Sequence, residues 1–119
     1  MQVKVIALLK SKPGLTRAEF IDYYETRHAP LIRSIAPQIR DYRRNYLEAD
    51  GAILAPGAGL PDFDVVTELW FDDQSAFDAA MVAFTDPQNA ARIAHDEENV
   101  FDRSRTRFFV VAERRSARD

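Results

Sequence analysis

The chain has 119 residues, of which 46% are hydrophobic and 29% are charged, and its net charge is −3 at pH 7. This balance is that of a single globular domain and excludes a disordered chain, while the lack of a basic stripe excludes a nucleic-acid-binding surface. The sequence has no Cys, which excludes disulfides and cysteine-based zinc sites.

The first two elements are clear from local patterns. Residues 2–10 alternate in the way that is typical of a strand. A helix follows, because Thr16 and Glu19 have the spacing of a capping box. Pro30 should end or kink this helix near Ala29, since proline lacks a backbone donor and crowds the preceding turn.

The middle of the chain predicts a second strand and a loop. Residues 38–48 alternate, with Tyr42 and Tyr46 on the same face, and charge on both faces indicates an edge strand. Residues 49–62 contain three of the four Gly and two of the six Pro. We expect a long loop there, and long loops in compact domains are often lids or binding loops.

The remaining elements complete a recognisable order. A third strand at 63–73 leads into a helix capped by Asp72 or Asp73, then a short helix after Asp86 and a last strand at 104–113. The order β-α-β-β-α-α-β is that of the α+β, ferredoxin-like split βαβ fold, a four-stranded antiparallel sheet with its helices on one face.

The sheet face away from the helices is predicted to be apolar. Ile6, Val66, Trp70 and Phe109 lie on it, and water contact with all of them would expose a larger patch than monomers usually tolerate. We therefore predict a homodimer in which two sheets close into a barrel, with the ligand pocket on this face. The alternatives are a monomer with an exposed face or one that covers it with the loop at 49–62.

Three sequence blocks resemble the EthD-domain family of the dimeric α+β-barrel superfamily. They are KSKPGLTRAEFIDYYETRHAPL at 10–31, FDVVTELWFDDQSAFDAA at 63–80 and DEENVFDRSRTRFFVVAE at 96–113. The resemblance implies a single EthD-like barrel domain over residues 1–115, followed by a tail at 116–119. Members of this family and related barrels include cyclases, decarboxylases, dehydratases, lactone isomerases, cofactor-free monooxygenases and small proteins linked to oxidative degradation.

His28 is the leading candidate for a catalytic residue. It is one of two histidines and lies in the first of these blocks, and an imidazole that titrates near pH 7 suits a general acid or base. The alternative is a histidine that caps the helix C-terminus. His95 is either a second, substrate-binding histidine or a surface residue beside three acids. Because no ligand spacing joins the two histidines, we predict no metal site.

Glu68 is the second catalytic candidate. On the predicted strand it shares a face with Trp70, in the expected barrel interior, where loss of solvation would raise its pKa and make it a base. The alternative is a structural ion pair with an arginine such as Arg44, Arg105 or Arg107.

Four aromatic residues are candidates for binding the substrate: Tyr24, Tyr42, Tyr46 and Trp70. They offer flat apolar surfaces with polar groups, although aromatic residues more often serve packing alone. The sequence contains no nucleophile elbow, phosphate-binding glycine motif or dinucleotide fingerprint. We therefore expect chemistry without a cofactor, or no chemistry.

Two functions are consistent with these features. The first is a cofactor-free lyase, isomerase or monooxygenase-like enzyme that binds a small apolar cyclic or aromatic metabolite, with proton transfer at His28. The second is an accessory protein that sequesters a reactive small molecule for an oxidative pathway. A His28 ordered against a carboxylate inside a closed pocket would favour the enzyme, and a solvent-facing His28 would favour the accessory protein.

The expected location is cytoplasmic. The segment MQVKVIALLK has no signal-peptide cleavage pattern, and no apolar run has membrane-spanning length. We therefore expect no contact with a membrane.

Overall fold

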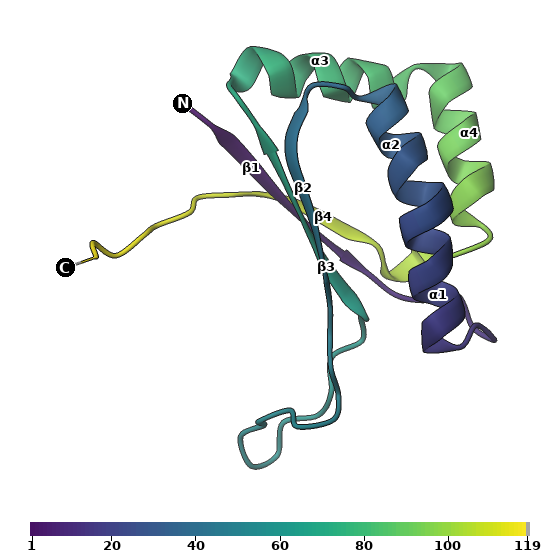
Figure 1. The fold of residues 1–119 in the computed structure, drawn as a ribbon, viewed down its shortest axis with the longest axis vertical. Coiled ribbons are helices and arrows are strands. Elements are labelled where there is room, and N and C mark those ends of the chain that lie inside the picture. Colours follow the sequence, from purple (N-terminus) through teal and green to yellow (C-terminus); the bar gives the residue numbers. More distant parts are fainter. Residues whose placement is uncertain (119) are drawn as a thin grey trace.

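The computed structural model describes residues 1–118 and contains a four-stranded antiparallel sheet in the order β2-β3-β1-β4, with its helices on one face (Figure 1). In chain order the elements are β1 (Val3–Leu9), α1 (Arg17–Tyr23), the π-helical turn η1 (Tyr24–His28), α2 (Ala29–Ile35), β2 (Ile39–Tyr46), β3 (Val65–Phe71), α3 (Gln74–Thr85), α4 (Pro87–Glu97), the 3-10 turn η2 (Arg103–Arg105) and β4 (Arg107–Val111). This topology confirms the predicted ferredoxin-like fold, with β2 as an edge strand.

Alternation along the central strands decides which side chains face the helices. Every second residue of β1 from Val5 and of β3 from Val65 is buried, because successive side chains of a strand point to opposite faces. The two strands pair with Ala7 opposite Thr67. Their buried rows therefore lie side by side and form the floor on which the helices pack.

The helices begin at the predicted residues. Thr16 and Glu19 form a reciprocal capping box at the start of α1. The side chains of Asp73 and Asp86 each accept a backbone N–H from the first turn of α3 and α4, respectively, which satisfies donors that a helix start leaves unpaired. None of the helices within residues 1–118 combines the length and hydropathy needed to cross a membrane.

Of the two predicted outcomes at Pro30, an end or a kink of the helix near Ala29, the end is not observed. The turn before Pro30 is π-helical, and the Ala29 N–H donates to the carbonyl of Tyr24, five positions earlier. Pro30 then lies in the first turn of α2, where a missing N–H is tolerated. The helical path continues to Ile35, so Tyr24 and His28 lie inside a continuous helical run instead of at its end.

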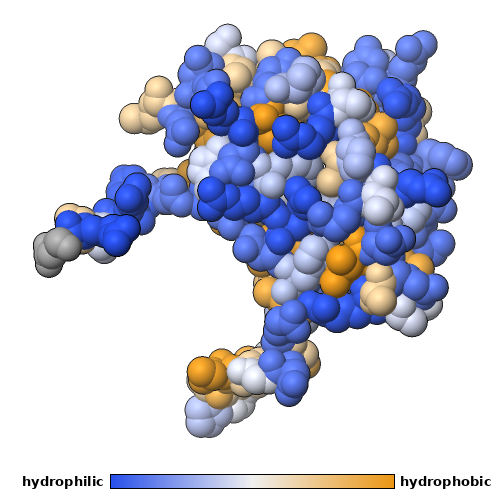
Figure 2. Space-filling view, in the orientation of Figure 1, coloured by the Kyte–Doolittle hydropathy of each residue, from blue (hydrophilic) through white to orange (hydrophobic). Residues whose placement is uncertain are grey.

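Two segments project from the body of the domain (Figures 1 and 2). One is the connection between β2 and β3, residues 47–64, called here the β2–β3 loop, which confirms the loop predicted at 49–62. Its tip carries exposed hydrophobic side chains, including Ile53, which is 98% exposed. The other is the C-terminal tail after β4, of which Asp119 lies outside the described residues. These projections give a radius of gyration of 15.6 Å, against about 13.5 Å for a compact domain of this length.

Candidate functional site

A cavity of about 280 Å³ lies between the helices and the sheet. Apolar side chains from both layers make up most of its wall, among them Leu69 of β3 and Ile93 of α4. The cavity is thus on the helix-covered face of the sheet, whereas the sequence predicted a pocket on the open face. The residues that line the cavity are Ala7, Leu9, Tyr24, His28, Ile32, Tyr42, Thr67, Leu69, Phe84, Ala90, Ile93, Glu97, Arg103, Thr106 and Phe108.

His28 is held in this wall by a carboxylate. Its Nδ1 lies 2.7 Å from Oδ2 of Asp96, and Oδ1 of Asp96 accepts a hydrogen bond from the Tyr23 hydroxyl at 2.8 Å. Only 4% of His28 is exposed, and burial lowers its pKa more than Asp96 raises it. The ring is therefore neutral near pH 7, and Nδ1 keeps its proton and donates it in a hydrogen bond to Asp96, which leaves the lone pair on Nε2.

A second carboxyl group lies beside that lone pair. Oε2 of Glu97 is 3.8 Å from Nε2 of His28, and Oε1 of Glu97 is 3.3 Å from Nε of Arg103. Burial raises the pKa of Glu97, although Arg103 opposes the shift. All three residues line the cavity, so a base and a carboxyl group with increased proton affinity occupy one wall.

Three buried hydroxyl groups occupy the sheet side of the cavity. The hydroxyl of Tyr24 lies 2.7 Å from that of Thr67 and 3.2 Å from that of Tyr42. Burial raises the pKa of Tyr24 to about 12 and raises that of Tyr42 as well, so both phenols stay protonated. The Tyr24 ring also packs edge-on against His28, with 5.2 Å between ring centroids. This contact joins the hydroxyl cluster to the imidazole.

Tyr46 and His95 lie outside this cavity. The Tyr46 hydroxyl donates to Glu25, which also pairs with Arg44. His95 is exposed on α4, the surface position that was the alternative interpretation of this residue. Residues 1–118 contain no cluster of three or more His, Asp or Glu side chains placed to hold a metal ion.

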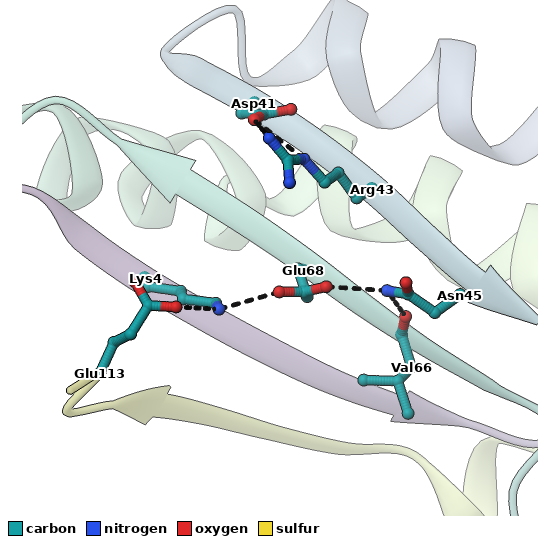
Figure 3. A network of polar contacts seen from close by, with 7 residues as sticks. All are labelled: Lys4, Asp41, Arg43, Asn45, Val66, Glu68 and Glu113. Atoms are coloured by element: carbon teal, nitrogen blue, oxygen red, sulfur yellow. Dashed lines mark hydrogen bonds and ion pairs between the residues drawn. The ribbon is translucent and has the colours of Figure 1, made fainter. Parts of the chain in front are cut away.

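Glu68 lies on the opposite face of the sheet (Figure 3). Trp70, two residues further along β3, shares this face by alternation. Glu68 contacts Nζ of Lys4 at 2.8 Å and accepts a hydrogen bond from Asn45 at 2.9 Å. The bond with Lys4 holds the pKa of Glu68 below its usual value, which contradicts the predicted rise. Lys4 Nζ also lies 4.6 Å from the centroid of the Trp70 ring. Because the sheet separates them, Glu68 and His28 do not share the helix-side cavity.

The arginines proposed as partners of Glu68 pair elsewhere. Arg44 bonds Glu25, while Arg105 and Arg107 both bond Asp62. The open face is also more polar than predicted, because an ion pair of Asp41 and Arg43 lies on it near the Lys4–Glu68 pair (Figure 3).

Asp96, Glu97 and Thr67 were not predicted from the sequence as site residues. The two acids follow His95 in a run that is typical of a solvated helix face, and Asp96 lies 68 positions from His28. The apolar residues Ala90 and Ile93 could have indicated the two acids. They mark the inward face of this helix, and residues 96 and 97 lie on the next turn of the same face.

Comparisons with known proteins agree with this fold. An EthD family protein from Bacillus halodurans C-125 is 26% identical with a TM-score of 0.63, over 96% of this chain and 100% of that chain. A dimeric ferredoxin-like protein from Thermobifida fusca YX is 18% identical with a TM-score of 0.59, over 95% and 92%. A hydroxynitrile lyase from Passiflora edulis is 18% identical with a TM-score of 0.60, over 97% of each chain.

The family follows from the sequence itself. No curated protein matches the chain, but the model of the EthD domain matches residues 12–104. That range includes His28, the hydroxyl cluster, Asp96 and Glu97, and it covers well over half of the chain. The protein therefore belongs to the EthD domain family.

Proposed function

We propose that this EthD domain protein binds a small, largely apolar cyclic or aromatic molecule between its helices and its sheet, and transfers a proton on it at Nε2 of His28. The observation that carries the proposal is the His28–Asp96 pair. Asp96 accepts a hydrogen bond from Nδ1 of His28 at 2.7 Å. Nε2 is therefore the basic nitrogen of the ring, and His28 lies in a wall of the cavity.

This arrangement suits proton transfer without a cofactor. A neutral imidazole takes a proton at Nε2, and the adjacent carboxylate orients the ring and stabilises the imidazolium that forms. Glu97, whose pKa is raised by burial, is placed to donate or receive a proton in the same wall. Abstraction of a hydrogen next to a carbonyl group, and eliminations that begin in this way, are the reaction classes that these groups serve.

Two observations favour an enzyme over an accessory binding protein. His28 is buried against a carboxylate inside the cavity, and burying such a pair costs desolvation energy that a purely apolar binding site would not incur. One neighbour of the same fold is a hydroxynitrile lyase, which supports a lyase-type activity here. The cytoplasmic location expected from the sequence is part of the proposal.

Hydrogen exchange at carbon tests the proposed proton transfer. The protein is incubated in D₂O with α-tetralone, 1-indanone or acetophenone, and loss of the signals of the hydrogens next to the carbonyl is followed by NMR. We expect protein-dependent exchange that falls about 10²–10⁴-fold in His28→Asn. His95→Asn is the matched control and should keep the full rate, since His95 is exposed outside the cavity. An unchanged rate in His28→Asn, or no protein-dependent exchange with any probe, would contradict the proposal.

We further propose that two copies associate through the open face of the sheet. Phe109 of β4, which lies beside Ile6 of the neighbouring strand β1, is 52% exposed. Ile53 at the tip of the β2–β3 loop has no cover from its own domain. Association of a second copy would remove such apolar surface from water, and the Thermobifida neighbour is a dimeric protein.

A further inference from the structure

We infer that the hydroxyl cluster of Tyr24, Tyr42 and Thr67 is the binding subsite for a carbonyl oxygen, so that the ligands of the cavity are cyclic or aromatic ketones. The inference rests on the proposed function above and deepens it, because it names the group on the ligand that the protein recognises. It is carried by a count of hydrogen-bond donors.

The cluster has one proton more than it uses. Three hydroxyl groups supply three protons, and the Tyr24 hydroxyl makes two contacts, with Thr67 at 2.7 Å and with Tyr42 at 3.2 Å. Each contact uses one proton, whichever oxygen donates. Within residues 1–118 these hydroxyls make no other side-chain hydrogen bond. One proton therefore remains without an acceptor, whatever the direction of the two bonds.

The remaining proton belongs to residues that face the cavity instead of the outer surface of the protein. Tyr24 is 1% exposed, Thr67 is 2% exposed and Tyr42 is 9% exposed, yet all three line the cavity. A buried donor without an acceptor is costly, and native proteins rarely leave one. An acceptor that enters the cavity would satisfy it.

The missing acceptor is best supplied by a carbonyl oxygen. Since the phenols hold their protons strongly, the cluster offers a donor and not a negative charge. A ketone oxygen accepts a hydrogen bond and brings no additional proton that would need an acceptor. The rest of a cyclic or aromatic ketone is apolar, as is most of the cavity wall, including Leu69 and Ile93.

The subsite also lies where the proposed chemistry needs it. The Tyr24 ring packs on the His28 ring, so the donor cluster and the base are neighbours. In the proposed step Nε2 of His28 takes a proton from the carbon next to the carbonyl. The C–H electron pair forms a C=C bond, and the C=O π pair moves to oxygen. The hydroxyl proton then stabilises the enolate oxygen, as preorganised donors do for developing oxyanions.

Binding of a matched pair of probes tests the inference without requiring turnover. α-Tetralone and tetralin share a bicyclic skeleton, but only α-tetralone has the oxygen. We expect the protein to bind α-tetralone about 3- to 10-fold more tightly than tetralin by NMR titration. The triple variant Tyr24→Phe/Tyr42→Phe/Thr67→Val keeps the shapes of the side chains and removes all three hydroxyls, so it should bind both probes equally.

Three controls make the result decisive. Tyr46→Phe removes a hydroxyl outside the cavity and should keep the preference for the ketone. His28→Asn should keep the preference while it loses proton exchange. If thermal unfolding shows that the triple variant is not folded, the carbonyl ¹³C signal of α-tetralone bound to the unmodified protein is measured instead. A hydroxyl that donates to the ketone oxygen should move this signal downfield of its position in cyclohexane, and an unshifted signal would overturn the inference.

Equal affinity of the unmodified protein for the two probes, or a preference that persists in the folded hydroxyl-free variant, overturns the inference and leaves the proposed cavity function standing. Failure of both probes to bind overturns the inference together with the binding proposal.

Discussion

The two ring nitrogens of His28 have different surroundings, and this difference makes the proposed activity dependent on pH. Burial lowers the pKa of His28, while Asp96 opposes the shift. The Nε2 lone pair should therefore be available throughout the neutral range and be lost only in acid. We expect proton exchange to rise with pH and level off, with a midpoint below 6.5, the ordinary pKa of a histidine side chain. A midpoint at or above 6.5, from the rate or from NMR of the His28 ring, would contradict the burial argument.

The lowered pKa of His28 also makes the stability of the fold depend on pH. The pKa of His28 is lower in the folded than in the unfolded protein. Its contribution to stability is therefore fully present above pH 6.5 and is lost as the pH falls from there through the folded pKa. Glu97 acts in the opposite direction, since its folded pKa is raised above 4.5 and its contribution is lost as pH rises through that folded value. Comparing unfolding curves of the unmodified protein and His28→Asn isolates the histidine contribution.

Glu68 lies outside the cavity, so its substitution should affect stability and not proton exchange. Glu68→Gln should leave proton exchange unchanged, because the side chain lies across the sheet from the cavity. It should lower the free energy of unfolding by less than about 1 kcal/mol, since its bond with Lys4 is partly exposed. The lowered pKa of Glu68 means that this difference is present above pH 4.5 and vanishes in acid. Urea unfolding at several pH values measures the difference, and a loss of exchange would show that Glu68 acts on the ligand.

At the scale of elements, the sequence predicted the order of strands and helices because its signals are local. Alternation identifies the strands, and the side-chain caps at Thr16, Asp73 and Asp86 mark the helix starts. Alternation also placed Tyr42 on the same face as Tyr46. The helix end that was one of the two alternatives for Pro30 is not observed, because a π-helical turn moves the hydrogen-bond register by one residue before the proline. Nothing in the composition of that turn marks it.

The candidate site was harder to predict, because it depends on how elements pack. His28 was identified from its residue type and its family block, but its partner Asp96 is on α4, far along the chain. The pairing of α4 with η1 is a tertiary contact that no local pattern encodes. The prediction that Glu68 points away from the helices was correct. The prediction that the pocket lies on the same side of the sheet as Glu68 was wrong, because a cavity between helices and sheet depends on the fit of many side chains.

For the whole molecule, the central prediction is a dimer that forms through the open face. Light scattering at micromolar concentration should give twice the chain mass of 13.6 kDa. Phe109→Asp should shift the protein towards the monomer, because it would replace the exposed apolar ring of Phe109 with a charge that association would bury. Val82→Asp is a matched control, since Val82 is 70% exposed on α3, on the helix side. A single-chain mass for the unmodified protein, or equal behaviour of the two variants, would contradict association through this face.

The sheet between Glu68 and His28 has a consequence for how substitutions combine. Effects on stability or function add when two sites share no contacts and lie well apart, and they interact when side chains touch. Changes around the cavity and changes on the open face belong to separate contact networks, because the hydrogen-bonded backbone of β1 and β3 lies between them. Selection could therefore alter ligand specificity on one side and assembly on the other independently, and a double substitution across the sheet should equal the sum of its single effects.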